Sequence, residues 1–398
     1  MDITLFPRKL SGTVAAIPSK SQAHRLLICA AFADAPTRLY CPQVNRDIEA
    51  TAGCLTALGA TVQRTEEGYL VHPAKEIPAS AVLNCYDSGS TLRFLLPIAG
   101  ALGVDTRFQM TGRLPQRPLS PLWEELERMG CTLSRPEPDT ICCTGRLRSG
   151  TYRISGSVSS QFITGLLFAI GLMDGESQIE IQGKLESKPY VVLTQKAMSL
   201  FHVDTDGYRV SGGQRFLTPG TVHVEGDWSN GAFFLAAKAL GSDVHVTNLD
   251  PDSPQGDRAT ASLLEQLNGF LVIPSEDIPD LVPILAVVAA ANRGAVFTHV
   301  QRLRLKESDR VNTVISLLTA LGGKAEATQD TLTVQGTGLT GGTVDAHNDH
   351  RIAMAAAIAA TACTRPVTIL GAECVEKSYP QFFQEYARLG GHYEQHIR

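Results

Sequence analysis

The chain has 398 residues, enough for more than one domain, and its net charge is −5. With 43% hydrophobic and 19% charged residues, the composition is that of an ordinary globular protein with a substantial core. The net charge excludes a whole-chain case for nucleic-acid binding, so any anion site must be a local cluster of Lys and Arg. The longest apolar runs, 282–291 and 352–360, are too short to span a bilayer, so we expect no membrane segment.

The nine cysteines are scattered and form no CxxC pair. We interpret them as small buried apolar residues in a reducing cytosol. No signal or transit peptide is visible, so we expect a cytoplasmic protein.

One pattern recurs along the chain, in which a helical segment ends near a Gly and a short strand follows. A Gly in the left-handed conformation is a common helix C-cap. A further copy at 198–204 lacks the Gly. The spacing of roughly fifty to seventy residues is too long for a solenoid and suits a repeated α+β unit. We therefore predict two domains of three units, although Leu-Gly at helix ends is also common by chance. The capping glycines are Gly59, Gly130, Gly269, Gly322 and Gly390.

The first basic helix start is the segment before a helix predicted at 26–33. It places Lys20, Ser21 and Arg25 around one helix N-terminus. The segment is not a Walker loop, because the Gly framework of that motif is missing. The alternative is an ordinary capped helix with exposed basic side chains.

Further polar helix starts follow in chain order. Small residues around Gly89 would let a ligand approach the backbone closely. Flanking prolines fix the direction of Arg117. Hydroxyl and amide groups at 159–161 suit a ligand that carries hydroxyls or phosphate, and 187–190 similarly precedes a helix. Each of these could instead be a simple N-cap.

The segments 306–310 and 345–351 give the strongest signal for an anion site. Arg310 and Arg351 each open a helix with apolar residues at helical spacing. A helix start offers unpaired N–H groups and a positive dipole end, so an Arg there is unfavourable unless an anion binds. The alternative is a pair of surface arginines in solvated ion pairs with neighbouring carboxylates.

Taken together, at least six predicted helix starts carry Lys, Arg, Ser or Gln in place of the usual Asp or Glu. Independent surface accidents at so many starts are a poor explanation. We therefore infer that these starts converge on a polyanionic ligand. His347 and His350 could form a metal pair, but no third ligand is evident, so we predict no metal.

These motifs resemble the EPSP synthase (3-phosphoshikimate 1-carboxyvinyltransferase) family of enolpyruvyl transferases over essentially the whole chain. The matching segments are Pro-Ser-Lys-Ser at 18–21, Asp-Ser-Gly-Ser-Thr-Leu-Arg at 87–93, Gly-Arg-Leu-Pro-Gln-Arg-Pro at 112–118, Gly-Ser-Val-Ser-Ser-Gln-Phe at 156–162, Ser-Lys-Pro-Tyr at 187–190, Val-Glu-Gly-Asp at 224–227, Asp-Ile-Pro-Asp at 277–280, Leu-Lys-Glu-Ser-Asp-Arg at 305–310, Asn-Asp-His-Arg at 348–351 and Glu-Lys-Ser-Tyr-Pro at 376–380.

The resemblance implies an α/β (α+β) fold of two domains, each an inside-out, barrel-like assembly of three βαβαββ-type units. One domain would hold residues 1–18 plus 228–398, and the other residues 19–227. The chain would cross between the domains twice, and the site would lie in the cleft.

The resemblance also implies a function. The enolpyruvyl (carboxyvinyl) group of phosphoenolpyruvate would move to the 5-hydroxyl of shikimate 3-phosphate, in the shikimate pathway to chorismate and the aromatic amino acids. The enzyme would be a monomer without cofactor or metal, and glyphosate would compete with phosphoenolpyruvate.

The implied roles fall into three sets. The groups around phosphoenolpyruvate would be Lys20, Gly89, Arg117, Gln161, Arg310, Arg351 and Lys377. The shikimate 3-phosphate site would be made by Lys20, Ser21, Arg25, Ser159, Ser160, Gln161, Ser187, Tyr190, Asp280 and Lys306. In catalysis, Asp280 would be the base for the hydroxyl and Glu307 the proton shuttle at the methylene carbon, with Lys20 beside them.

The sequence departs from the family pattern in places. Pro18 replaces a Gly of the first motif, and Asp87 stands where many members have Asn. Arg302 falls where some members have an Asn that contacts the shikimate phosphate, so we leave it out of the site. The stretch 256–277 is shorter than usual, which leaves the strand count of one unit open.

Particular residues argue against two rival functions. The UDP-N-acetylglucosamine enolpyruvyl transferases usually carry a Cys in the loop corresponding to 112–119, and this chain has none there. A non-catalytic binding protein for a phosphorylated metabolite would gain nothing from carboxylates in its pocket, so Asp280 and Glu307 argue against it.

Overall fold

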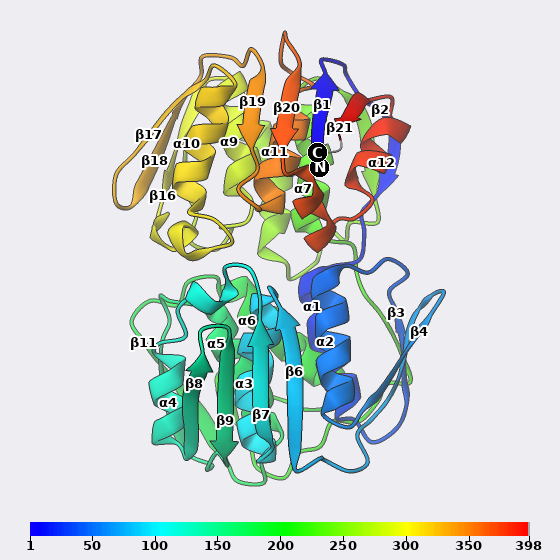
Figure 1. Ribbon diagram of the computed structural model, residues 1–398, viewed down its shortest axis with the longest axis vertical. Helices are drawn as coiled ribbons and strands as arrows, with labels where there is room; N and C mark the ends of the chain where they lie inside the picture. The colour runs from blue at the N-terminus through cyan, green and yellow to red at the C-terminus, as the bar shows by residue number, and fades with distance from the viewer. Residues whose placement is uncertain (397–398) are drawn as a thin grey trace. The chain divides into compact units, whose positions relative to one another are not determined.

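The computed structural model describes residues 1–396, and the chain folds as two compact units (Figure 1). The first unit combines Met1–Ile17 with the residues from Glu225 onward, and the second is the continuous segment Pro18–Val224. Pro18 therefore lies in the second unit and 225–227 in the first, a few residues from the predicted boundaries. The N–H of Asp227 donates to the carbonyl of Ile17 at 2.8 Å, which holds the two crossing segments together.

The second unit contains one complete βαβαββ repeat. Its first two strands are parallel and the later pairs are antiparallel, in the order β6-β7-β9-β8. In chain order the repeat comprises β6 (Ser80–Tyr86), α3 (Gly89–Leu102), β7 (Asp105–Met110), α4 (Leu122–Arg128), β8 (Cys131–Glu137) and β9 (Thr140–Gly145), with the 3-10 helix η1 (Leu114–Gln116) before α4.

Residues 18–224 also form two variants of this repeat, one with a four-stranded and one with a three-stranded sheet. The order β13-β3-β5-β4 takes its first strand from the end of the segment, and β10-β11-β12 ends in a two-residue strand. The elements are α1 (Lys20–Ala31), β3 (Thr37–Tyr40), α2 (Arg46–Ala57), β4 (Thr61–Thr65), β5 (Gly68–His72), β10 (Thr151–Ser155), α5 (Ser160–Gly171), β11 (Ser177–Gln182), α6 (Lys188–Leu200), β12 (Arg209–Val210) and β13 (Thr221–His223).

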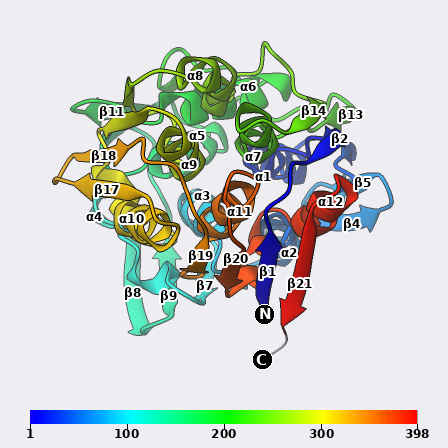
Figure 2. The same ribbon diagram turned by 90° about the horizontal axis from the view of Figure 1, so that it is seen from above.

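The first unit has its own complete repeat, with strand order β15-β16-β18-β17. A second sheet, β19-β20-β1-β21, brings the N-terminal strand between two C-terminal ones (Figure 2). The elements are β1 (Asp2–Phe6), β15 (Leu271–Pro274), α9 (Val282–Ala291), β16 (Gly294–Thr298), η3 (Gln301–Leu305), α10 (Arg310–Ala320), β17 (Lys324–Ala327), β18 (Thr331–Gln335), β19 (Gly342–Asp345), α11 (His350–Ala359), β20 (Val367–Leu370), η4 (Ala372–Lys377), α12 (Phe382–Arg388) and β21 (His392–His396).

The remaining repeat of the first unit is shortened. Its sheet is the parallel pair β14-β2, and its elements are β2 (Ser11–Ala15), α7 (Trp228–Ala239), β14 (Asp243–Thr247), η2 (Gly256–Ala259) and α8 (Thr260–Gln266). Only 267–270 separate α8 from β15, which is too short a segment for a further hairpin. The short stretch seen in the sequence therefore removes the last two strands of this repeat.

The predicted glycine caps are confirmed with one exception. Gly59, Gly130, Gly322 and Gly390 all have positive φ, between 83° and 120°, and a strand follows each. Gly269 does not adopt a left-handed conformation, so the prediction was wrong there. Its N–H closes a turn on the carbonyl of Gln266 at 3.1 Å, next to the shortened connection.

Each unit has its own hydrophobic core, built around helices that are buried almost all round. In the first unit α9 packs against α11, and in the second α3 packs against α5. The nine cysteines are free and mostly buried, as their spacing predicts. Within residues 1–396, no helix combines the length and the apolar character needed to cross a membrane.

Candidate active site

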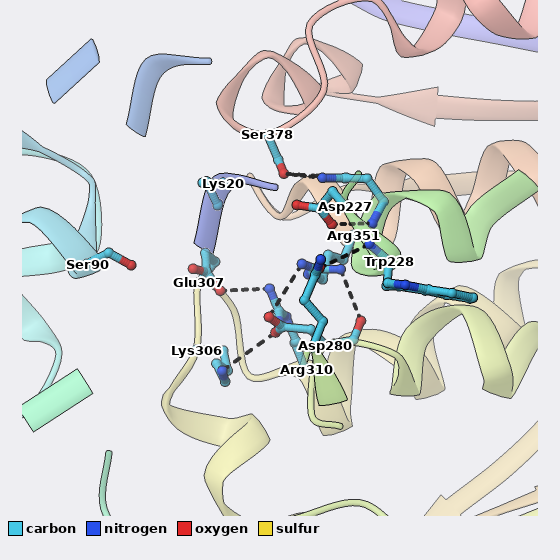
Figure 3. A network of polar contacts seen from close by, with 12 residues as sticks. Lys20, Ser90, Asp227, Trp228, Asp280, Lys306, Glu307, Arg310, Arg351 and Ser378 are labelled. Atoms are coloured by element: carbon cyan, nitrogen blue, oxygen red, sulfur yellow. Dashed lines mark hydrogen bonds and ion pairs between the residues drawn. The ribbon is translucent and has the colours of Figure 1, made fainter. Parts of the chain in front are cut away.

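Arg310, the first residue of α10, lies at the centre of a buried polar network in the first unit (Figure 3). Its Nη1 is 2.5 Å from Asp280 Oδ1, its Nη2 is 2.7 Å from Glu307 Oε2, and its Nε is 2.8 Å from Asp349 Oδ2. Burial alone would lower the pKa of Arg310, but Asp349, Glu307 and Asp280 outweigh it and raise the pKa well above its ordinary value. Because Arg310 is only 1% exposed, the alternative of a solvated surface pair is wrong.

Asp280 lies just before α9 and faces several cations. Lys306 Nζ is 3.5 Å from its Oδ1, and Arg351 Nη2 is 3.4 Å from its Oδ2. Burial acts to raise the pKa of Asp280, but the charges of Arg351, Lys306 and Arg310 prevail and hold it well below the usual range. Asp280 is therefore ionised at neutral pH.

Asp349 is a residue that sequence reasoning did not assign. It is fully buried, caps α11 by accepting from the N–H of Arg351 at 3.0 Å, and accepts from the hydroxyl of Ser308 at 2.8 Å. Together with its bonds to Arg310, these contacts tie the starts of α10 and α11 to one carboxylate. Asp349 therefore positions both of the predicted anion-binding arginines.

Lys306 and Lys377 complete the basic groups of this unit. Burial, opposed by the charge of Asp280, lowers the pKa of Lys306 to about 8. Lys377 ends η4 and is buried, and the next residue, Ser378, accepts from Asn230 Nδ2 at 3.2 Å. Asp227 caps α7 at the N–H of Asn230, at 2.8 Å, so this corner is fixed by buried hydrogen bonds.

In the second unit, Lys20 is the first residue of α1, and Ser19 caps the helix. Its Nζ lies 2.9 Å from Asp47 Oδ2, and both side chains are largely buried. Asp47, on α2, was not assigned from the sequence because nothing local links it to Lys20. The pair holds the ammonium group in place at the helix start.

Arg25 is more deeply buried than a simple ligand-binding residue. Its Nε donates to Thr194 Oγ1 at 2.8 Å, and its Nη2 donates to the carbonyl of Tyr190 at 2.9 Å and to Thr164 Oγ1 at 3.3 Å. Burial lowers the pKa of Arg25 to about 9. The contacts tie α1, α5 and α6 together, and binding of shikimate 3-phosphate by Arg25 stays a prediction.

Arg93 is a third residue that sequence reasoning missed. Its Nη1 donates to Gln161 Oε1 at 2.7 Å, and its Nη2 donates to the carbonyl of Pro118 at 3.1 Å. Gln161 Nε2 in turn donates to Ser90 Oγ at 3.0 Å. Arg93 thereby fixes the amide orientation of Gln161 and anchors the loop that carries Arg117.

Gly89 is the first residue of α3, and its φ is not in the left-handed region. A Cβ at this position would lie 2.7 Å from Arg117 Nη1 and 3.3 Å from Arg93 Nη1. The requirement for glycine therefore comes from the close approach of the Arg117 guanidinium. Gly89 does not serve a positive-φ turn.

The remaining predicted groups lie at helix starts, as expected. Ser159 caps α5 and accepts from the N–H of Gln161, and Ser160 is the first residue of that helix. Ser187 precedes α6 with φ 56° and ψ 38°, an uncommon conformation for a residue other than glycine, and Tyr190 lies in the first turn. Backbone strain of this kind is frequent at ligand sites.

The pattern of uncharged or basic helix starts is confirmed at six of the helices that carry the motifs, but not at α4, whose first turn contains Glu124 and Glu125. The first turns of α1, α3, α5, α6, α10 and α11 contain no acidic residue. The sequence reading overlooked that α10 and α11 are capped by Asp309 and Asp349. No group of three or more potential metal ligands occurs among residues 1–396, so His347 and His350 form no such cluster there.

Comparison with known proteins assigns the chain to a family. The sequence matches the model of the family described as EPSP synthase (3-phosphoshikimate 1-carboxyvinyltransferase) over residues 6–276 and 272–386. The 3-phosphoshikimate 1-carboxyvinyltransferase of Clostridium kluyveri is 39% identical over 417 aligned residues, covering 98% of this chain and 97% of that protein. The enzyme of the same name from Clostridioides difficile is 36% identical, with 98% and 97% covered.

Solved structures show the same fold. EPSP synthase from Acinetobacter baumannii superposes with a TM-score of 0.81 at 23% identity, covering 99% of this chain and all of that one. The enolpyruvyl transferase NikO from Streptomyces tendae gives 0.75 at 18% identity, covering 99% and 98%. At these identities the structures establish the two-domain α/β enolpyruvyl transferase fold alone. The sequence matches add the family, and the chain therefore belongs to the EPSP synthase (3-phosphoshikimate 1-carboxyvinyltransferase) family.

Proposed function

We propose that the residues described above carry out the reaction that membership of this family assigns to the chain. That reaction forms 5-enolpyruvylshikimate 3-phosphate and phosphate from phosphoenolpyruvate and shikimate 3-phosphate. The observation that supports the residue assignment most directly is Asp280, an ionised carboxylate in contact with Lys306, Arg310 and Arg351.

Arg310 and Arg351 are proposed to bind the carboxylate of phosphoenolpyruvate, since guanidinium groups bind carboxylates in a bidentate manner. In the structure, Asp280, Glu307 and Asp349 occupy the donors of Arg310. Substrate binding is therefore an exchange of one carboxylate for another. Asp349 is fully buried and also caps α11, so Asp280 and Glu307 are the partners that exchange.

This exchange would activate the base. The nearby cations hold the pKa of Asp280 well below its usual range, which makes it a poor proton acceptor. When the substrate carboxylate takes up part of the charge of Arg310 and Arg351, the pKa of Asp280 rises. Asp280 then accepts the proton of the 5-hydroxyl as its oxygen bonds to C2 of phosphoenolpyruvate. Binding of one substrate thereby prepares attack by the other.

Glu307 is proposed to protonate the methylene carbon in the same step, after release from its 2.7 Å contact with Arg310 Nη2. Glu307 then takes back a proton from the new methyl group, while phosphate leaves with the proton that came from the 5-hydroxyl, and the double bond is restored. Lys20, Gly89, Arg117, Gln161 and Lys377 are proposed to surround the phosphate that leaves. Fixed positive groups of this kind stabilise the developing anion.

The shikimate 3-phosphate site is proposed to comprise the hydroxyl and basic groups at the starts of α1, α5 and α6, together with Asp280 and Lys306. The strained Ser187 and the buried Ser159 and Ser160 support this assignment, because ordered hydroxyls suit a ligand that carries hydroxyls and phosphate. Since these groups all come from a single chain, we also propose a monomeric enzyme, which sedimentation at working concentration can check.

The test is phosphate release from phosphoenolpyruvate, measured with and without shikimate 3-phosphate. We expect release only when both are present, and full activity in the presence of a metal chelator. Turnover with UDP-N-acetylglucosamine in place of shikimate 3-phosphate, or loss of activity to the chelator, would overturn the proposal. Absence of any turnover would favour the non-catalytic binding protein.

A further inference from the structure

Two hydrogen-bonded side-chain pairs, here called rungs, join α1 to α2 in the second unit. The more deeply buried rung has no assigned role. Lys20 Nζ lies 2.9 Å from Asp47 Oδ2, and His24 Nδ1 lies 2.7 Å from Thr51 Oγ1. The four-residue spacing on each helix places both rungs on the facing sides. His24 and Thr51 are 1% and 0% exposed, so they can influence a ligand only through other residues.

The deeper rung continues to the start of α3. Thr51 Oγ1 is 2.7 Å from Thr91 Oγ1, and the Thr91 hydroxyl donates to Ser88 Oγ at 2.8 Å. Ser88 Oγ also accepts from the N–H of Thr91 at 3.3 Å, and this bond makes Ser88 the N-cap of α3. The hydrogen-bonded chain His24–Thr51–Thr91–Ser88 therefore runs from α1 to the residue before Gly89.

Proton counting fixes the direction of this chain, because each hydroxyl has one proton to donate. Thr91 gives its proton to Ser88, so it accepts from Thr51. Thr51 has then used its proton and must accept from His24 Nδ1. His24 is therefore the Nδ1–H tautomer, and its Nε2 is a bare acceptor.

The surroundings of His24 agree with this assignment. Its Nε2 is buried and has no hydrogen-bond partner among residues 1–396, so the ring is held through Nδ1 alone. Burial, opposed by the charge of Asp47, lowers the pKa of His24 to about 3, which keeps the ring neutral. A neutral ring with one proton on Nδ1 is the state that the chain of hydroxyls requires.

We propose that His24 and Thr51 are positioning residues for the phosphoenolpyruvate phosphate, acting through Thr91 on the Ser88 cap of α3. This inference rests on the proposed function, which puts that phosphate at Lys20 and Gly89. The chain fixes the Ser88 side chain and with it the N–H groups of the first turn. Within the hydrogen-bonded series His24–Thr51–Thr91–Ser88, the Ser88 hydroxyl proton is the one that makes no bond. The Ser88 hydroxyl can therefore donate to the phosphate anion.

The kinetic test is Thr51→Val, which keeps the shape of the side chain and removes its hydroxyl. We expect the KM for phosphoenolpyruvate to rise roughly fivefold or more, as for loss of a buried hydrogen bond, with the KM for shikimate 3-phosphate within about twofold. Thr51→Ser should restore the wild-type value. The matched control is Thr56→Val on the same helix, whose hydroxyl donates to the carbonyl of Ala52 at 3.0 Å and which should leave both constants unchanged.

Wild-type turnover is measured first, so that two failures can be told apart. No turnover at all contradicts the proposed function. Normal wild-type turnover, with equal rises in both KM values or no rise in Thr51→Val, contradicts the positioning role alone.

A second measurement needs no variant of Thr51 to fold. Nitrogen-15 NMR of histidine-labelled protein, with His24 assigned by comparison with His24→Asn, reports which ring nitrogen carries the proton. We expect Nδ1–H and bare Nε2 from about pH 5 to about pH 8, the range in which an ordinary His titrates. A proton on Nε2, or titration of His24 in that range, would overturn the proposal.

Discussion

Arg310 and Asp280 neutralise one another across a 2.5 Å ion pair, although one is the proposed receptor for the substrate carboxylate and the other the proposed base. The pair keeps Asp280 strongly ionised, which makes it a weak proton acceptor while it is paired. If the substrate carboxylate displaces Asp280 from Arg310, as proposed above, binding and proton transfer are linked through one guanidinium group.

Asp280→Asn separates these two roles. We expect kcat to fall by about 10²–10⁴, the usual loss for removal of a general base. The KM for phosphoenolpyruvate should stay unchanged or decrease, because Asn no longer competes for Arg310 and Arg351. Steady-state kinetics with each substrate varied in turn gives both constants. A kcat within about threefold of the wild-type value would place the base elsewhere.

Lys306 predicts an alkaline limit to activity. Its pKa is about 8 in the folded protein, so kcat/KM for shikimate 3-phosphate should fall as the pH rises through about 8. Lys306→Arg should move that fall to higher pH, because Arg stays charged. Lys324→Arg, an exposed lysine on β17, is the control and should leave the profile unchanged. An unchanged profile in Lys306→Arg would assign the limit to another group.

The same lysine has the opposite effect on stability. Its folded pKa of about 8 lies below the ordinary value of 10.5, so between these values the unfolded chain binds more protons. The contribution of Lys306 to the free energy of unfolding therefore rises with pH across that window, while binding weakens. Urea titrations between about pH 8 and pH 10.5 give the free energies of unfolding of the wild type and of Lys306→Met. The difference between these two free energies should narrow as the pH rises.

Gly89→Ala should act through Arg117. The added methyl group would lie 2.7 Å from Arg117 Nη1, so the guanidinium must move. Overpacking typically costs about 1–3 kcal/mol, and we expect a higher KM for phosphoenolpyruvate and a larger rise in the inhibition constant of glyphosate, which is longer. The melting temperature should change little, because the φ of Gly89 is ordinary.

The control for this prediction is Gly53→Ala on α2, where a Cβ meets no atom within 4 Å. That variant should keep both constants and be slightly more stable, since Ala favours helix over Gly. Equal weakening of both ligands by Gly89→Ala, with a lowered melting temperature, would point to a defect in folding and remove Gly89 from the site.

Asp349→Asn should be mainly a stability mutant. Asp349 is fully buried and bonds Ser308, Arg310 and the N–H of Arg351, so the substitution leaves a buried guanidinium without its full compensation. Breaking a buried ion pair typically costs about 3–5 kcal/mol. Denaturant unfolding measures the loss, and Asp345→Asn, an exposed carboxylate nearby, should lose far less. Similar losses in the two variants would contradict the assigned role of Asp349.

Local signals in the sequence located the helix starts of the site approximately. The helix predicted at 26–33 begins at Lys20, so that prediction was wrong at its start and Arg25 lies in the second turn. Lys20, Gly89, Arg310 and Arg351 all stand in the first turns of helices, because caps and apolar spacing are properties of short segments. Recognition of the family rested on the same segments. The sequence also indicated the shortened repeat, because a missing hairpin makes the stretch 256–277 shorter than usual.

The partners of these residues could not be predicted in the same way. Asp47 lies 27 positions from Lys20, Asp349 lies 39 positions from Arg310, and Gln161 lies 68 positions from Arg93. A side-chain pair across such distances leaves no periodic or local trace. The weak basicity of Asp280 likewise depends on burial and on charges from two separate segments, 306–310 and 345–351, so it could be found only from the fold.

The strand β1 is synthesised long before β20 and β21, the two strands with which it pairs. Leu5 pairs with both Val367 and Tyr393, so the sheet that holds β1 cannot form until almost the entire chain has left the ribosome. Pro18–Val224, by contrast, is continuous and has its own core, so it can fold while the ribosome is still adding the rest. During synthesis, the strands β1 and β2 therefore stay without their partner strands while Pro18–Val224 folds, and this interval is when we expect the protein to depend most on chaperones.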